Sequence, residues 1–249
     1  MATIRRHVVI TGGGRGIGAE IARRFASLGD RVTILARTRD EVERVADEVN
    51  GFGIRCDVGE PASVEAAFMA AGPVDVLINN AGVARSSPVL KTDVRVWDEH
   101  LRVNLTGAFL CALKVLPSMA NRGKGRIINV ASVAGLKGYP YLAAYVASKH
   151  GLVGLTRALA VEYADKGVTV NAVCPGYVDS PLLTQSVANI VEKTGRTPDE
   201  VRAELEAHSP QNRFFEAAEV ASMCVFLASD EARGVNGQAI PICGGALNS

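Results

Sequence analysis

The fold of this chain is decided by the stretch His7-Val8-Val9-Ile10-Thr11-Gly12-Gly13-Gly14-Arg15-Gly16-Ile17-Gly18. Its first five residues predict a short, mostly apolar β-strand, and residues 16–28 carry apolar side chains at helical spacing. The glycines between them allow the backbone to turn tightly and to approach a ligand closely. A helix N-terminus directly after such a turn offers N–H groups and positive potential to a phosphate. The stretch therefore predicts a strand–turn–helix unit that binds a dinucleotide.

Strand-like and helix-like segments alternate along the rest of the chain. The expected strands are nearly continuously apolar, which is typical of a parallel sheet with helices on both faces. The pattern predicts an α/β fold, a doubly wound Rossmann-type parallel sheet, in a single domain over residues 1–249. The expected strands are 7–11, 31–36, 53–56, 74–79, 126–131, 168–174 and 238–242. The expected helices are 16–28, 40–49, 62–71, 94–119, 143–164 and 217–228.

One segment, residues 180–213, departs from this alternation. It is polar, is interrupted by Gly195 and Pro198, and is too long for an ordinary connection. We expect a pair of short helices that closes over a substrate pocket as a lid. A contact between subunits is the alternative interpretation.

Composition excludes several classes of function. Lys and Arg number 27 against 26 Asp and Glu, so the chain has no net-charge signature of nucleic-acid or membrane-surface binding. We expect no membrane span, because no apolar run approaches the required length, and no signal peptide, because the first expected strand begins within a few residues of Met1. The five scattered cysteines lack metal-site spacing and are expected to be buried thiols. These features predict a cytoplasmic protein without a metal.

Two arginines indicate which dinucleotide binds. An NAD site usually has an acidic residue at the end of the second strand, where this chain has Arg37. Arg37 and Arg15, in the glycine turn, suit the oxygens of a 2′-phosphate. NADP(H) is therefore favoured, and NAD(H) is the alternative if both arginines are only solvated surface charges. Asp57 follows the third strand and either accepts a hydrogen bond from adenine or caps the helix near Pro61.

A tyrosine and a lysine suggest the reaction. Tyr145 and Lys149 lie one helical turn apart and so on the same face of an expected helix. A tyrosine in water has a pKa of ~10, and we expect the charge of Lys149 to lower it. Ser132 ends a strand and can donate a hydrogen bond to a substrate oxygen beside Tyr145. With a nicotinamide to move the hydride, these groups predict a carbonyl–alcohol oxidoreductase.

Several motifs, in this order and spacing, resemble those of the single-domain short-chain dehydrogenase/reductase family. The resemblance implies that Asn104, Ser132, Tyr145 and Lys149 are catalytic, that Lys149 also binds the nicotinamide ribose, and that no metal is needed. It implies that Asn104 lies in a helix kink, where its backbone holds a water of a proton relay. The motifs are residues 11–18, Asn79-Asn80-Ala81-Gly82, Asn104-Leu105-Thr106-Gly107, Ser132, Tyr145-Val146-Ala147-Ser148-Lys149 and Pro175-Gly176.

The resemblance also completes the expected cofactor site. Pro175 and Gly176 should pass beneath the nicotinamide, and Ser180 stands where the family often has a threonine that contacts the carboxamide or a phosphate. The expected contacts are Gly12, Gly14, Arg15, Gly16, Ile17, Gly18, Arg37, Asp57, Val58, Asn80, Ala81, Gly82, Tyr145, Lys149, Pro175, Gly176, Val178 and Ser180.

The substrate is less well specified. The loops 84–86, 134–141 and 177–183 are mostly apolar, which suits an apolar or aromatic ketone or an acyl chain. The chain resembles 3-oxoacyl-thioester reductases and 3-hydroxybutyrate-type dehydrogenases, and residues 243–247 resemble those of some aromatic polyketide ketoreductases. Arg85 and Lys137 either hold an acidic or thioester-phosphate group or face water.

Three functions follow as expectations. NADPH-dependent reduction of a 3-oxoacyl thioester or a similar ketone is favoured over NAD-dependent oxidation of a secondary alcohol or 3-hydroxyacid. A non-catalytic dinucleotide sensor or scaffold is the alternative from another class. By resemblance the chain should form a homotetramer through the helices 94–119 and 143–164 and through the last helix and strand. Burial within one subunit explains the apolar character of the helix 143–164 equally well.

Overall fold

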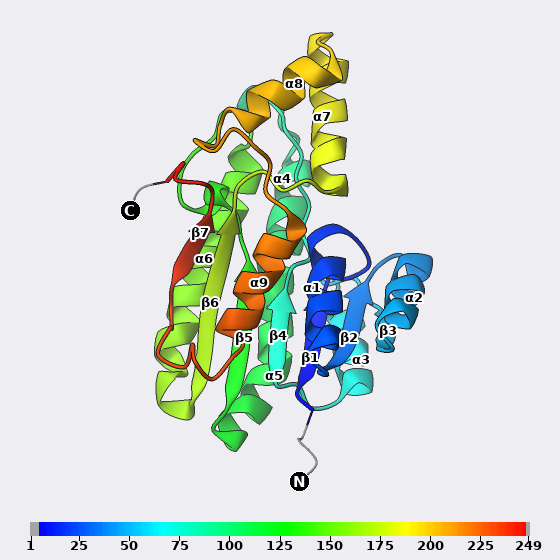
Figure 1. Ribbon diagram of the computed structural model, residues 1–249, viewed down its shortest axis with the longest axis vertical. Helices are drawn as coiled ribbons and strands as arrows, with labels where there is room; N and C mark the ends of the chain where they lie inside the picture. Colours follow the sequence, from blue (N-terminus) through cyan, green and yellow to red (C-terminus); the bar gives the residue numbers. More distant parts are fainter. Residues whose placement is uncertain (1–4, 248–249) are drawn as a thin grey trace.

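In residues 5–247, which the computed structural model describes, seven parallel strands form one twisted sheet (Figure 1). Their order is β3-β2-β1-β4-β5-β6-β7, so the direction of winding reverses between β1 and β4. A reversal of this kind leaves a crevice at the carboxyl ends of the strands. The strands are β1 His7–Thr11, β2 Arg31–Ala36, β3 Phe52–Arg55, β4 Val76–Asn79, β5 Gly125–Val130, β6 Val168–Pro175 and β7 Ala239–Ile242.

Helices cover both faces of the sheet, as the sequence predicted. One face packs against α1 Gly16–Ser27, α2 Arg39–Glu48 and α9 Ala217–Leu227. The other packs against α3 Pro61–Ala71, α5 Gly107–Arg122 and α6 Ala143–Glu162. The doubly wound α/β fold is thereby confirmed, with boundary differences of one or two residues at most elements.

The continuous apolar run of β1 follows from this two-sided cover. Val8 and Ile10 contribute to the apolar cluster shared with α1 and α9, whereas Val9 contributes to the cluster on the α5 face. Alternate side chains of a strand point to opposite faces, so a strand between two helical layers needs apolar residues at every position. All five cysteines are free and buried, as expected.

The helix expected over residues 94–119 is interrupted. The structure has α4 Val94–Leu101, then a π-helical turn, Arg102–Thr106, and then α5. Asn104 lies in this turn, and its side chain bonds the backbone of Val83 and the hydroxyl of Ser148. A π turn inserts one extra residue, which apolar periodicity does not reveal.

The same stretch corrects a second expectation. Residues Val94–Arg122 are long and apolar enough, by length and composition, to cross a membrane. Half of the apolar window is buried inside the protein, however, and α5 supplies Cys111, Val115 and Leu116 to the core. The apolar character of this helix is therefore accounted for by its packing against the sheet.

The polar segment after β6 forms two helices, α7 Pro181–Thr194 and α8 Pro198–Glu206, above the carboxyl end of the sheet (Figure 1). Gly195 ends α7 with a positive φ of 71°, and a capping box between Thr197 and Glu200 begins α8. Leu183, Val187, Val201 and Leu205 form a small apolar cluster of their own. The pair is thus held together separately from the main core.

His7, the first residue of β1, is a buried group that makes the stability of the protein depend on pH. Its side chain is 5% exposed, with Nδ1 2.7 Å from the Pro73 carbonyl oxygen and Nε2 2.8 Å from the Thr33 hydroxyl. Burial lowers the pKa of His7 below its usual 6.5; the bond to Pro73 opposes this effect and the charge of Arg31 adds to it.

We predict that acidification destabilises the protein through His7. As pH falls through 6.5, the unfolded chain takes up a proton that the folded chain does not, so the free energy of unfolding should fall. Urea denaturation at about pH 7.5 and about pH 5.5 measures this change. His7→Gln should reduce the acid sensitivity, whereas a variant of the exposed His150, His150→Gln, should keep it. Equal pH dependence in wild type and His7→Gln would contradict the prediction.

Candidate active site

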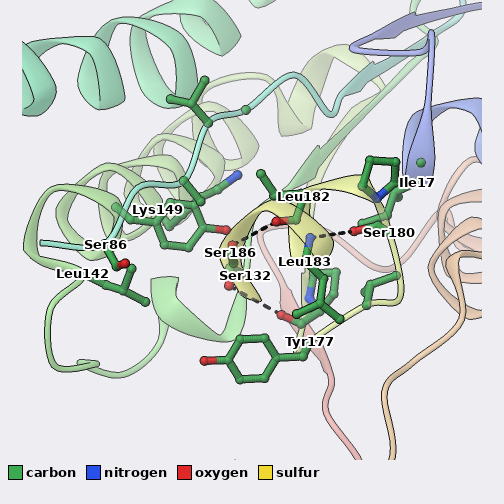
Figure 2. A pocket seen from close by; sticks show the side chains of 18 of the residues that line it. Ile17, Ser86, Ser132, Leu142, Lys149, Tyr177, Ser180, Leu182, Leu183 and Ser186 are labelled. Carbon is green, nitrogen blue, oxygen red and sulfur yellow. Dashed lines mark hydrogen bonds between the residues drawn. The ribbon is translucent and has the colours of Figure 1, made fainter. Parts of the chain in front are cut away.

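A long cavity occupies the crevice at the carboxyl ends of the strands. It runs from the glycine turn and the end of β2, past the ends of β4, β5 and β6, to the inner sides of α7 and α8. Figure 2 shows Ile17 and Ser180 at one side of this cavity and Ser132, Lys149, Ser86 and Leu142 deeper in it. All of the expected site residues line the cavity except Gly18 and Asn104.

The glycine turn is packed too tightly for side chains. Gly12 has a φ of 63°, and a Cβ atom there would lie 2.8 Å from the Cα of Ala81. A Cβ at Gly18 would lie 2.3 Å from the carbonyl oxygen of Gly12. Gly18 therefore lets α1 approach the turn and does not itself face the cavity. Gly12, Gly14, Gly16 and Ile17 do line it, at the N-terminus of α1.

Thr11 fixes the turn to the end of β4. Its hydroxyl oxygen accepts hydrogen bonds from the backbone N–H groups of Asn80, at 3.0 Å, and Ala81, at 3.1 Å. In return the Asn80 amide donates to the carbonyl oxygens of Thr11 and Gly12. Sequence reasoning missed the role of Thr11, for which a hydroxyl at the last position of a strand was the only signal.

The outer end of the cavity is lined by two arginines and by two acidic side chains, Glu41 and Asp57. Arg15 lies 3.6 Å from the carboxylate of Glu41, and Arg15 and Arg37 both line the cavity. Among residues 5–247, no ion pair involves Arg37, whose side chain is exposed. A guanidinium group without a carboxylate partner, beside a glycine turn, suits the 2′-phosphate of NADP(H).

Asp57 does not cap the following helix. Its carboxylate accepts a hydrogen bond from the N–H of Gly59 at 2.9 Å, and the N-cap of α3 is Glu60. Asp57 and Val58 both line the cavity. The capping alternative is therefore wrong, and the hydrogen bond from adenine to Asp57 stays a prediction.

Tyr145, Lys149 and Ser132 meet at the inner end of the cavity. Lys149 is 4% exposed, and its ammonium group donates to the carbonyl oxygen of Val130 at 2.9 Å. The same nitrogen lies 5.8 Å from the centre of the Tyr145 ring. The Ser132 hydroxyl lies 3.5 Å from the carbonyl oxygen of Pro175. Helix α6 thus supplies the ammonium and the phenol, and the end of β5 supplies the hydroxyl, at one place.

The pKa of Tyr145 differs from the expectation. Burial raises it, although a hydrogen bond with Ser132 opposes part of the rise. Burial also lowers the pKa of Lys149, to about 8. The lysine bonds Val130 and lies over the phenol ring, so desolvation outweighs its attraction for a phenolate. Near neutral pH, Tyr145 is therefore a neutral proton donor and Lys149 is largely charged.

Asn104 lies behind the cavity wall and is 1% exposed. Its side-chain oxygen accepts from the N–H of Val83 at 2.8 Å. Its amide donates to the carbonyl oxygen of Val83 at 3.0 Å and to the Ser148 hydroxyl at 2.9 Å. Ser148 in turn donates to the carbonyl oxygen of Tyr145. Asn104 therefore joins the loop after β4 to the helix that carries Tyr145 and Lys149.

The remaining expected cofactor residues follow β6. Pro175, Gly176, Val178 and Ser180 all line the cavity. The Ser180 oxygen accepts from the N–H of Leu183 at 3.4 Å as the N-cap of α7. Its O–H remains able to donate to a ligand, so a serine in place of threonine preserves a hydroxyl at this position.

The inner end of the cavity is lined by aromatic side chains where it lies beneath α7 and α8. The ring of His208 meets that of Tyr177 at 5.7 Å, nearly edge-on, and that of Tyr139 at 6.5 Å. Lys193 of α7 donates to the carbonyl oxygen of Ser86 at 2.6 Å and so bridges the helix pair to the loop after β4. Sequence reasoning missed His208 and Lys193, because nothing in a polar stretch marks which side chains turn inward.

Comparison with known proteins places these observations in a family. Residues 6–191 match the model of the short chain dehydrogenase family. The chain is 38% identical to a protein named as a ketoacyl reductase of the granaticin polyketide synthase of Streptomyces violaceoruber, over 96% of this chain and 92% of the relative. It is 38% identical to a D-beta-hydroxybutyrate dehydrogenase of Rhizobium meliloti, over 95% and 96%, and 41% identical to oxidoreductase UcpA of Salmonella typhimurium, over 96% and 93%.

Solved structures agree. A crystal structure of a variant actinorhodin polyketide ketoreductase with NADPH superposes with a TM-score of 0.93 at 37% identity and 100% coverage of both chains. Levodione reductase gives a TM-score of 0.92 at 34% identity, with 96% of each chain covered. By motif, fold and sequence identity, this chain belongs to the short-chain dehydrogenase family of oxidoreductases.

Proposed function

We propose that this protein is an NADPH-dependent ketoreductase that converts a ketone to a secondary alcohol. The observation that carries the proposal is one cavity with two chemically distinct ends. Arg15 and Arg37 lie at one end, and Ser132, Tyr145 and Lys149 converge at the other. NADPH, when bound, supplies the hydride, and the similar actinorhodin ketoreductase structure contains that cofactor.

In the proposed reaction, the side chains position the carbonyl group and supply the proton. Ser132 donates a hydrogen bond to the substrate oxygen and holds it beside Tyr145. The raised pKa of Tyr145 keeps its proton available, and the phenol transfers that proton to the oxygen as negative charge develops there. The Lys149 ammonium then stabilises the phenolate. The turn that contains Asn104 would hold the water through which the proton is replaced.

The cavity favours a neutral ketone over a free hydroxyacid. A carboxylate substrate needs an unpaired cation close to the hydride-accepting carbon. Of the basic residues nearby, Arg85 lies 3.3 Å from Glu99, Lys137 lies over the Tyr139 ring, and Lys193 bonds the Ser86 carbonyl oxygen. We therefore propose a ketone with an apolar or aromatic body, including 3-oxoacyl thioesters, and retain the NAD-dependent hydroxyacid reaction as the alternative.

We further propose a cytoplasmic homotetramer with α7 and α8 as a substrate lid. Exposed apolar side chains on the outer faces of α5 and α6 support assembly, because Phe109 is 41% exposed, Leu113 47% and Val161 82%. The bridge from Lys193 to Ser86 and the inward position of Leu182 and Leu183 support the lid (Figure 2). No nucleic-acid or membrane partner is expected.

Tyr145→Phe should greatly reduce turnover of the ketone but leave the binding of NADPH intact. The change removes the only proton that the proposal transfers from the protein, so kcat/KM for the ketone should fall by about 10²–10⁴-fold. The dissociation constant for NADPH, measured by fluorescence titration, should change by less than about twofold. Tyr163→Phe, at the other end of α6, is the matched control. Full turnover in Tyr145→Phe would refute the assigned role and leave a sensor or scaffold as the better account.

Arg37→Ala should weaken the binding of NADPH but not that of NADH. Loss of a charge-assisted contact with the 2′-phosphate should raise the NADPH dissociation constant by about 10–100-fold and leave that for NADH nearly unchanged. Arg39→Ala serves as the control, since Arg39 is exposed and bonds Glu43 on its own helix. A parallel effect on both cofactors, or none, would show that Arg37 is not a phosphate ligand.

NADPH affinity should weaken as pH rises through the pKa of Lys149, which burial lowers to about 8. The charged lysine is the form that donates to the ribose, and it is lost above this pKa. Titrations at about pH 7 and about pH 9 should therefore differ by up to about tenfold in the dissociation constant. Lys149→Gln should bind more weakly and without this pH dependence. A wild-type affinity independent of pH would contradict the proposed contact.

A further inference from the structure

His100 is a fully buried histidine that the proposed reaction does not use. It lies on α4, is 0% exposed, and does not line the cavity. Its Nδ1 lies 2.7 Å from the carbonyl oxygen of Val96, so this nitrogen carries the proton. Its Nε2 accepts a hydrogen bond from the backbone N–H of Arg85 at 3.1 Å. Both bonds together define a neutral imidazole with one donor and one acceptor.

The Nε2 atom of His100 binds the loop of residues 83–87, which forms one wall of the cavity. Residues 83–87 have no helix or strand partner, and other groups satisfy their backbone. Asn104 holds both polar backbone groups of Val83, and His100 holds the N–H of Arg85. At the far end of the loop, the N–H of Ser87 donates to the carbonyl oxygen of Tyr141 at 2.8 Å. Between these two, Lys193 donates to the carbonyl oxygen of Ser86, so His100 is one of four anchors and the one that binds the N–H of Arg85.

The same imidazole touches the proton donor. The ring centres of His100 and Tyr145 are 6.4 Å apart at an interplanar angle of 79°, an edge-to-face contact. On its other side the anchored loop presents Ser86 to the cavity, where Figure 2 shows it near Leu142 and below Lys149. One side chain therefore contacts both the substrate-side wall and the ring of Tyr145.

We propose that His100 is a positioning residue that sets the distance between the 83–87 wall and Tyr145, and thereby the fit of the ketone. The proposal rests on the ketoreductase function. An apolar residue of similar size would fill the same space, but it would leave the Arg85 N–H without an acceptor. The wall would then be held at Val83, Ser86 and Ser87 but not at Arg85, and the pocket between it and Tyr145 would widen.

Two substitutions separate the hydrogen bond from the ring. His100→Phe keeps an aromatic ring against Tyr145 and removes the acceptor, whereas His100→Gln replaces the ring with an amide oxygen that can accept from Arg85. His100→Phe should raise KM for the ketone about tenfold with a smaller change in kcat. Its NADPH dissociation constant should match that of wild type, and His100→Gln should restore most of the wild-type KM.

Hydrogen exchange at the Arg85 amide tests the anchor without relying on activity. Exchange should be faster in His100→Phe than in wild type or His100→Gln. If wild type turns over no ketone but this pattern is found, the ketoreductase proposal fails while the anchor stands. An unchanged KM for the ketone and unchanged hydrogen exchange at Arg85 in His100→Phe would overturn the inference. An equal rise in KM in both variants, accompanied by weaker NADPH binding, would also overturn it.

A backbone substitution covers the case in which the core variants do not fold. Arg85→Pro removes the N–H donor from an exposed residue, and Arg85→Ala removes the same side chain but keeps the N–H. KM for the ketone should be higher in the proline variant than in the alanine variant. Equal KM values in the two would overturn the proposed role of the bond to His100.

Discussion

The site depends on one buried charge, the ammonium group of Lys149. This group carries three N–H donors, and the structure supplies one acceptor in the protein, the carbonyl oxygen of Val130 at 2.9 Å. A buried cation so sparsely bonded is costly, which is why burial lowers the pKa of Lys149 to about 8. The hydroxyls of the nicotinamide ribose are acceptors that its remaining N–H donors can reach in the proposed complex.

The fold keeps this charge in place through polar contacts between the sheet and α6. Asn79 at the end of β4 donates to Asn129 of β5 at 2.9 Å, and Asn129 donates to Thr156 of α6 at 2.8 Å. Asn104 bonds the hydroxyl of Ser148, the residue directly before Lys149 on α6. Parallel strands place all of these groups at one edge, where the chain reverses its winding. Helix and sheet are therefore fixed to each other before any ligand binds.

Much of this arrangement could be predicted from sequence because it rests on local pattern. The apolar run through Val8, Val9 and Ile10 indicates a strand covered on both faces, and Gly195 with Pro198 marks where α7 gives way to α8. The four-residue spacing of Tyr145 and Lys149 places them on one face of a helix. What sequence could not supply depends on neighbours distant in the chain. Family resemblance placed Asn104 in a helix kink, but its side-chain bonds to Val83 and Ser148 could not be predicted. Those bonds, the packing role of Gly18 and the raised pKa of Tyr145 each follow from contacts with another element.

The central claim, hydride transfer to a ketone, is tested most directly with NADPH fully deuterated at the reactive carbon of its nicotinamide ring. Wild-type enzyme is incubated with this cofactor and an aryl ketone, and the product is analysed by mass spectrometry. The account predicts a secondary alcohol with one deuterium on the carbinol carbon, formed about 10²–10⁴-fold more slowly by Tyr145→Phe. Absence of deuterated alcohol across linear, cyclic and aryl ketones, from protein that binds NADPH tightly, would contradict the account.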